Sequence, residues 1–416
     1  MKKKVISMFL TACTVSVMVV GGGSNLVMAD DAETVTLMGW YDEDDMNEQM
    51  DGKYVIEYTY VANTDYNNVL STQLASGEGP DIIMDGTNYP AEIKAGNVED
   101  ISDYDFVKEF NEAGMSLCSA DGKIYGIPSY GWFSGIWCNA SILEECGVEI
   151  PKTFDEFVAA CETINEKGYT AYGFGIADDS TATSSLLGYL ENSYYHNNEE
   201  ANPDGTDFDT KFALGEVTMD GHINDCVNKW CTLVEKGLIA SESLGISCQE
   251  MLNSFKNGEV AFLHGGPWQY TELKESGVNF KMLPQLSETG ENEYVLGGPA
   301  ACFGINVNTE NHDGAEATLT ALASVEVQQA FADANVGGTS YRSGVEAQMP
   351  EEYEYVADII NNGNIAFPSD RWSVNLPSQS LFDEFTAQLQ GVISGDISGD
   401  DLVKAIDTKA DSIRYE

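Results

Sequence analysis

The chain has 416 residues, and its 68 acidic side chains against 20 Lys and Arg give a formal net charge of −48. Because phosphate recognition requires clustered cations, this balance argues against nucleic acid or an anionic membrane surface as a partner. A hydrophobic content of 43%, with 10% aromatic residues, is typical of a folded protein, and the length allows two domains.

The N-terminus has the pattern of an export signal. Lysines at positions 2–4 precede an apolar run, Val5 to Val20, that is too short for a comfortable membrane span. Small residues at 27–29 predict cleavage after Ala29, so we expect residues 1–29 to be a signal peptide and the protein to be exported, whether extracellular, periplasmic or associated with the cell surface. The stretch Leu10-Thr11-Ala12-Cys13 is similar to a bacterial lipobox, which leaves a lipid anchor on Cys13 as the alternative.

Strands and helices alternate in the region that follows. Residues 35–38 and 54–60 are predicted as strands, and residues 66–74 have helical spacing that ends at Gly77. Residues 81–84 then form a short apolar run with the character of a buried strand. This β-β-α-β order predicts an α/β fold with mostly parallel sheets flanked by helices.

Later helices are indicated by capping signals and apolar stripes. Thr153 and Glu156 have the S/T-x-x-E spacing of a capping box at a helix start. Apolar stripes predict helices near residues 223–234, 315–323 and 381–389, and Trp230 in the first is expected in the core. The polar, acidic segment 197–209 is predicted as a surface loop.

Eight cysteines follow residue 29, with neither a C-x-x-C pair nor a cluster with histidine. We therefore expect no zinc site, and no cofactor of any kind. An exported protein can oxidise its cysteines, but their spacing does not reveal a pairing. Several occupy apolar helical positions, which favours buried thiols.

Several segments, taken in order, resemble a known family. They read LASGEGPDII at 74–83, GKIYGIP at 122–128, GVEIPKTFDEF at 147–157, FKNGEVAF at 255–262, GGPW at 265–268 and LGGP at 296–299. Each segment is weak alone, but the ordered set is similar to the extracellular solute-binding proteins of ABC sugar importers, the family that includes maltodextrin-binding protein. Trp137 and Cys138 depart from the aliphatic-Tyr pair usual in that family.

The resemblance implies a two-lobed fold of the periplasmic-binding-protein type, with the ligand between the lobes. We expect residues 30–131 plus 302–346 to form the N-terminal lobe, and residues 132–301 plus 347–416 to form the C-terminal lobe. Crossovers are expected near 129–135, 299–304 and 344–350. The implied function is capture of a sugar or oligosaccharide by a monomer that delivers it to membrane permease subunits, without catalysis.

Sugar recognition needs aromatic platforms and planar polar groups, which open α/β sheets place beyond the ends of their strands. The expected ligand-binding residues are Trp40, Tyr41, Asp42, Asp85, Tyr130, Trp132, Tyr195, Trp268, Gly298, Arg342 and Trp372. Trp268 is the strongest of them, because it follows a predicted strand and resembles the stacking Trp of the family's GPW motif. Structural roles remain open for the others, such as a turn for Asp85, a local salt bridge for Arg342 and core packing for the aromatic residues.

Two alternatives remain open at this stage. A secreted glycoside hydrolase would need two carboxyl groups about 5–10 Å apart, which so acidic a chain could supply. The sequence contains no G-x-S-x-G and no H-E-x-x-H pattern, so serine-type hydrolysis and zinc-dependent proteolysis are not indicated. Within the binding class, an acidic cleft could instead hold a polyamine.

Overall fold

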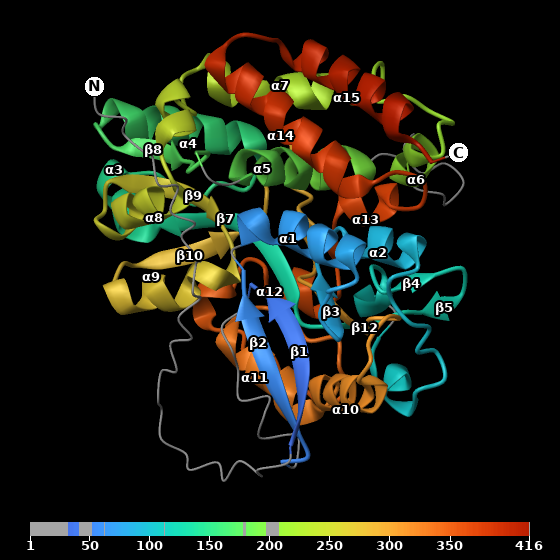
Figure 1. Ribbon diagram of the computed structural model, residues 1–416. Coiled ribbons are helices and arrows are strands. Elements are labelled where there is room, and N and C mark those ends of the chain that lie inside the picture. Colours follow the sequence, from blue (N-terminus) through green and yellow to red (C-terminus); the bar gives the residue numbers. More distant parts are fainter. Residues whose placement is uncertain are drawn as a thin grey trace, which may run out of the picture.

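Two β-sheets organise the chain (Figure 1), and the computed structural model describes residues 32–40, 52–61, 63–111, 113–177, 180–196 and 208–415. The first sheet has the order β2 (Tyr54–Tyr60), β1 (Glu33–Gly39), β3 (Ile82–Asp85), β12 (Cys302–Ile305) and β6 (Ile127–Pro128). The second has the order β13 (Ile365–Ala366), β11 (Val295–Pro299), β7 (Gly131–Asn139), β9 (Val260–Gly265) and β8 (Thr170–Gly173), with β10 (Phe280–Leu283) also paired to β7. The expected signal peptide and its cleavage site lie outside the described residues.

Helices pack around both sheets. The first sheet is accompanied by α1 (Asn63–Ser76), α2 (Tyr89–Ala95), α10 (His312–Leu322), α11 (Val325–Ala334), the short 3₁₀ turns η2 (Asp105–Glu109) and η3 (Ala113–Met115), and the hairpin β4 (Ser119–Ala120)–β5 (Lys123–Ile124). The second sheet is accompanied by α3 (Ala140–Cys146), α4 (Phe154–Glu166), α5 (Thr181–Leu190), α6 (Phe208–Ala213), α7 (Asn224–Glu235), α8 (Cys248–Lys256), α9 (Tyr270–Ser276), α12 (Ala357–Asn361), α13 (Pro368–Trp372), α14 (Ser378–Ser394) and α15 (Gly399–Ile413). Its short turns are η4 (Glu191–Tyr195), η5 (Ser241–Gly245), η6 (Pro267–Gln269) and η7 (Glu351–Tyr353). Among the described helices, none combines the length and apolarity needed to cross a membrane.

Both sheets are mixed, so the expectation of mostly parallel sheets was wrong. Strand β1 is parallel to β2 and β3, but β12 is antiparallel to both β3 and β6. In the second sheet β7 is antiparallel to β9, β10 and β11. The physical reason is the connectivity, because β6 runs into β7, and β11 into β12, through links of two residues. Parallel neighbouring strands need a long crossover connection, usually a helix. A two-residue link instead carries the chain straight into the other sheet, where the new strand runs antiparallel to its neighbours.

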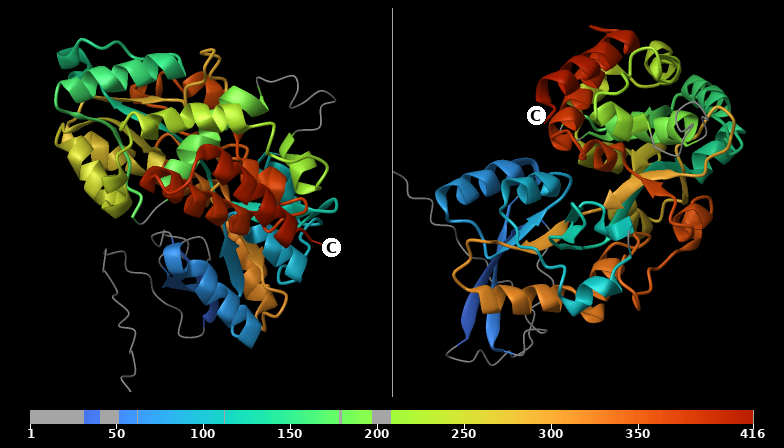
Figure 2. Two further views of the ribbon diagram at one scale, coloured as in Figure 1. Left: turned by 90° about the horizontal axis from the view of Figure 1, so that it is seen from above. Right: turned by 90° about the vertical axis from the view of Figure 1, so that its right-hand side faces the viewer.

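The direct links hold the two sheets beside each other, and Figure 2 shows the helices of the two sheets on either side of them. The amide of Ser129 donates to the carbonyl of Ala301 at 2.8 Å, and the amide of Ala300 donates to the carbonyl of Tyr130 at 2.8 Å. A third segment joins them, because Gly131 and Thr339 exchange backbone hydrogen bonds of 2.6 and 2.9 Å. These bonds make a narrow bundle of crossing segments between the two sheets.

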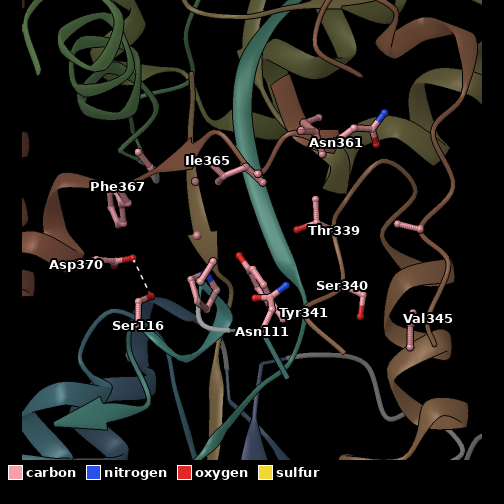
Figure 3. A pocket seen from close by; sticks show the side chains of 18 of the residues that line it. Asn111, Ser116, Thr339, Ser340, Tyr341, Val345, Asn361, Ile365, Phe367 and Asp370 are labelled. Carbon is pink, nitrogen blue, oxygen red and sulfur yellow. Dashed lines mark hydrogen bonds between the residues drawn. The ribbon is translucent and has the colours of Figure 1, made fainter. Parts of the chain in front are cut away.

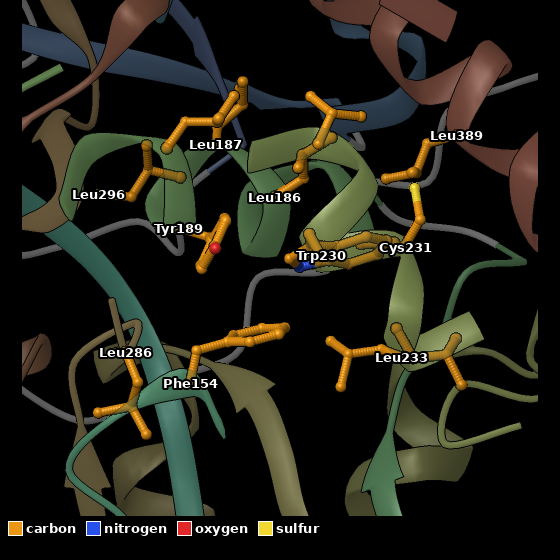
Figure 4. Packing of buried hydrophobic residues seen from close by; sticks show 14 of the residues in the cluster. Phe154, Leu186, Leu187, Tyr189, Trp230, Cys231, Leu233, Leu286, Leu296 and Leu389 are labelled. Carbon is orange, nitrogen blue, oxygen red and sulfur yellow. The ribbon is translucent and has the colours of Figure 1, made fainter. Parts of the chain in front are cut away.

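The largest apolar cluster lies around the second sheet (Figure 4). Trp230 of α7 is 1% exposed and packs there with Phe154 and Leu186, which confirms its expected core position.

Thr153 caps α4 as predicted, since its hydroxyl accepts from the amide of Glu156. The reciprocal half of the capping box is shifted by one residue, because the Glu156 carboxylate accepts from the amide of Lys152 at 2.8 Å.

The structure pairs two of the cysteines whose pairing the sequence did not reveal. Cys118 and Cys302 form a disulfide within the apolar cluster of the first sheet.

Residues 197–207 of the predicted surface loop lie outside the described residues. Its last two residues, Phe208 and Asp209, begin α6 and are buried, so this end of the prediction was wrong. The acidic Asp209 is buried because it pairs with Arg371, a partner that spacing along the chain does not indicate.

Candidate functional site

The tightest group of predicted site residues contains two indoles on the second sheet. Trp132 lies in β7, and Trp268 lies in η6, directly after the neighbouring strand β9. Their ring centroids are 6.3 Å apart with the planes inclined by 59°. The Trp132 ring also meets Phe367 edge-on at 5.4 Å. Trp268 stays 51% exposed, so this pair forms an aromatic surface open to solvent, which we call the indole pair.

The glycine before Pro267 is required for the position of Trp268. A Cβ built on Gly266 would lie 2.1 Å from the Trp268 ring and 2.4 Å from the Phe133 carbonyl oxygen. The indole therefore folds back over bare backbone, which any side chain would obstruct. The GGPW sequence thus places a large, half-exposed ring at the end of a buried strand.

Trp40 lies at the corresponding end of the first sheet, after β1. Its ring packs against Tyr66 at 4.7 Å in an edge-to-face arrangement, and it also lies close to Gly86. Tyr60, at the end of the adjacent parallel strand β2, is 62% exposed and was not predicted as a site residue. The sequence did offer a signal for it, because Tyr60 is an aromatic residue at the last position of a predicted strand. Tyr41 and Asp42 lie outside the described residues.

Asp85 ends β3, as expected, but its oxygens bind locally. One accepts from the amide of Gly86 at 2.7 Å, and the other accepts from the Asn88 side chain at 3.0 Å. The side chain is buried, and burial raises its pKa to about 7, against the lowering effect of these two hydrogen bonds. The carboxylate therefore shapes the turn that leads into α2, as the alternative interpretation had it.

Tyr130 and Gly298 belong to the two crossing segments. Tyr130 is half-buried and packs against the core of the first sheet. Gly298 pairs with Trp132 across β11 and β7, and it lines a cavity between the two sheets. Gly298 is therefore next to the indole pair, whereas Tyr130 packs on the side of the first sheet.

Three predicted residues make structural contacts away from the indole pair, for a common reason: each has a buried partner from a distant segment. Tyr195 is 3% exposed and packs between Tyr194, Phe208 and Arg371. Trp372 is fully buried, stacks on Phe385 at 5.4 Å and donates its indole N–H to Asp209 at 2.7 Å. Arg342 donates to the Ala323 carbonyl at 2.7 Å and pairs with Glu109 at 3.3 Å. We do not include these three in the candidate site.

Two cavities lie between the sheets, with volumes of about 510 Å³ and about 680 Å³. Figure 3 shows the first, where Asn111, Ser116 and Tyr341 approach from the first-sheet side and Phe367 and Asp370 from α13 and the chain before it. Of the predicted residues that the structure describes, only Gly298 lines it. Asp370 and Arg371 line both cavities.

Trp372 was predicted as a site residue from the sequence, whereas Asp370, two positions before it, was not. Arg371 directs its guanidinium to Glu191 at 2.6 Å and to Asp209 at 2.7 Å, so two buried carboxylates hold it. Burial raises the pKa of Asp209 to about 6, although Arg371 acts to lower it. No group of three or more His, Cys, Asp and Glu side chains arranged to hold a metal occurs in the part of the chain that the structure describes.

Comparisons with known proteins identify the family and the fold of the chain. The family model described as bacterial extracellular solute-binding protein matches residues 44–358. The multiple sugar-binding protein of Streptococcus mutans is 23% identical over 279 residues, which cover 65% of this chain and 64% of that protein.

Two solved structures share the fold. A family 1 extracellular solute-binding protein from Bifidobacterium longum subsp. infantis has a TM-score of 0.70 at 24% identity, covering 92% of this chain and all of that one. The raffinose complex of the solute-binding protein RafE has a TM-score of 0.70 at 19% identity, covering 91% of this chain and 99% of that one. The fold is therefore the two-lobed, periplasmic-binding-protein type, with mixed sheets. Since the family model spans most of the chain, this protein belongs to the bacterial extracellular solute-binding proteins.

Proposed function

We propose that this protein captures a sugar or oligosaccharide between its two sheets and delivers it to the membrane permease of an ABC importer. The observation that carries the proposal is the indole pair, in which the ring of Trp268 is half-exposed at the end of a buried strand. Indole faces match the apolar C–H faces of sugar rings, and adjoining aromatic rings at the surface are typical of a site that binds another molecule. The sugar-binding relative and the raffinose-bound neighbour support the same ligand class.

The crossing segments support a mechanism of hinge closure. The proposed lobes are residues 30–131 plus 302–346 and residues 132–301 plus 347–416, with residues 1–29 as the export signal. Contacts already link them, since Thr87 donates to Gln379 at 2.5 Å and Ser378 donates to the Thr87 carbonyl at 3.3 Å. A ligand held by both lobes would favour the closed arrangement, and that shape would be the one that the permease recognises. The sugar would leave chemically unchanged.

Titration calorimetry with raffinose, stachyose, maltotriose, a chitin oligosaccharide and spermidine tests the ligand class. We expect at least one sugar to bind with a Kd of about 1 μM or lower, near −8 kcal/mol, as scavenging of dilute solute requires. A shift of tryptophan fluorescence should accompany binding, because two indoles lie at the site. Tight binding of spermidine with no response to any sugar would reject the sugar in favour of a polyamine.

A chromatographic assay of the bound sugar after prolonged incubation tests the absence of chemistry. Recovery of the intact sugar is expected, whereas shortened products that accumulate with protein concentration would favour a glycoside hydrolase. These two experiments separate the three functions that the sequence left open.

A further inference from the structure

The carboxylate of Asp370 lies on the same face of the second sheet as the indole of Trp132. Its Oδ2 atom is 3.2 Å from where a Cβ on Gly298 would stand, so it occupies space that a side chain at Gly298 would otherwise fill. Gly298 is the direct cross-strand partner of Trp132, and such partners project from one face of a sheet. Phe367, three residues before Asp370, touches the Trp132 ring. The carboxylate and the indole pair are therefore parts of one surface.

One oxygen of this carboxylate has nothing to bind. Oδ1 is shielded from water and accepts no hydrogen bond from any residue that the structure describes. Oδ2 meets only a long contact of 3.5 Å from the Ser116 hydroxyl, on the first-sheet side. The charge of the adjacent Arg371 acts to lower the pKa of Asp370, while its guanidinium pairs with Glu191 and Asp209. Burial raises the pKa of Asp370 to about 7, which is the expected cost of shielding a carboxylate without enough donors.

The surroundings fit a ligand that brings hydroxyl donors. Asp370 lines both cavities between the sheets, and Figure 3 shows it beside Ser116 in the first. Asn111, Thr339 and Ser340 add amide and hydroxyl groups around the first cavity. A buried polar atom without a partner calls for an explanation, and an incoming donor supplies one here.

We propose that Asp370 is a ligand-binding residue, whose carboxylate accepts hydrogen bonds from hydroxyl groups of the sugar ring that the indole pair holds. This inference rests on the proposed function and adds a polar contact to its aromatic one. Hydroxyl donors from a ligand would favour the ionised form of the carboxylate. Hydrogen bonds to an ionised acceptor are stronger than neutral ones, so Asp370 would contribute strongly to affinity. Its contact with Ser116 also places it where a ligand would meet both sheets at once.

Calorimetry on Asp370→Asn tests the proposal, using whichever sugar of the panel binds the unaltered protein. The amide keeps the shape but loses the charge, and we expect Kd to rise at least tenfold. The melting temperature without ligand should stay the same or increase, because a poorly paired carboxylate, one oxygen of which is shielded from water, has been removed. Asp396→Asn is the matched control, since Asp396 is exposed, lines neither cavity and carries the same charge. Its Kd should not change.

A Kd of Asp370→Asn within twofold of the original would overturn the role of Asp370 and leave sugar binding intact. If that variant melts early, Asp370→Ser replaces it, and unweakened binding by a stable serine variant would overturn the role equally. If the unaltered protein bound none of the sugars, the proposed function itself would be rejected. The two failures are thus distinguishable in one series of titrations.

Discussion

The two halves of the fold differ in how they use cysteine. The first sheet carries the disulfide between Cys118 and Cys302, which joins positions 184 residues apart. The free cysteines among the described residues all accompany the second sheet; they are Cys138, Cys146, Cys161, Cys226, Cys231 and Cys248. The second sheet has the larger apolar cluster and packs most of these thiols as small hydrophobic groups. The comparison suggests that a covalent link supports the half with the smaller core.

The same halves differ in what they offer a ligand. In the first, Trp40 is braced by Tyr66 and Asp85 is held in its turn. In the second, Trp268 is half-exposed and one oxygen of Asp370 has no partner among the described residues. We therefore expect most of the binding free energy to come from the second half, and each variant below tests one side of this comparison.

The largest effect is expected from Trp372→Ala, which opens a cavity in the core of the second half. The substitution removes the stack on Phe385 and the hydrogen bond to Asp209, and it should lower the free energy of unfolding by about 3–5 kcal/mol. Urea denaturation measures the loss. Trp372→Phe keeps the stack and should lose less; equal losses for both would point to the hydrogen bond as the main contribution.

Removing the disulfide tests the support of the first half. The double variant Cys118→Ser/Cys302→Ser should lose about 2–4 kcal/mol of unfolding free energy, because the unfolded chain gains freedom. Dithiothreitol should destabilise the original protein and leave the double variant unchanged. The number of thiols titrated per molecule in denaturant should rise by two when the original protein is reduced. No rise would mean that the disulfide does not form.

Trp268→Ala is expected to weaken binding rather than folding. Loss of the exposed ring should cost about 1–3 kcal/mol of sugar affinity, by analogy with burial of a large apolar side chain. The free energy of unfolding should change little, since the ring is 51% exposed. Trp268→Phe should restore part of the affinity, and calorimetry paired with urea denaturation separates the two effects. An unchanged Kd for the alanine variant would remove Trp268 from the site.

The smallest effect concerns pH. The folded pKa of Asp85 is raised to about 7, so between about pH 4 and pH 7 the folded state binds more protons than the unfolded state. This group therefore makes the protein less stable as pH rises through that window. Asp85→Asn should reduce the loss of stability between pH 5 and pH 8 by about 1–2 kcal/mol. Asp396→Asn serves as the control, and identical pH slopes for all three proteins would contradict the assignment.

Local signals in the sequence predicted the elements well. β1, β2, α1 and β3 occur where the alternation of patterns indicated, and the caps of α4 and the stripe of α7 were also confirmed. These features depend on neighbours within a few residues, so a single sequence contains the information. The antiparallel direction of β12 was not predicted, because it depends on the short links between the sheets and not on a local pattern of residues.

The candidate site shows the same division. The GGPW motif pointed to Trp268, because a glycine, a proline and a large ring after a strand have a local consequence. Asp370 was not predicted because it lies over Gly298, which is 72 residues away in the sequence. The burial of Trp372 was not predicted either, because Asp209 and Phe385 reach its ring from segments on either side of it in the sequence.

By itself, the sequence determined the class of protein, the α/β character and Trp268 as the strongest aromatic candidate, since each follows from composition, short-range pattern or an ordered set of motifs. Only the tertiary structure decided which aromatic rings are buried, which cysteines join and which carboxylate lacks a partner. Burial and pairing depend on what packs against a side chain from distant segments, and two residues of one type with similar neighbours in sequence can meet opposite surroundings.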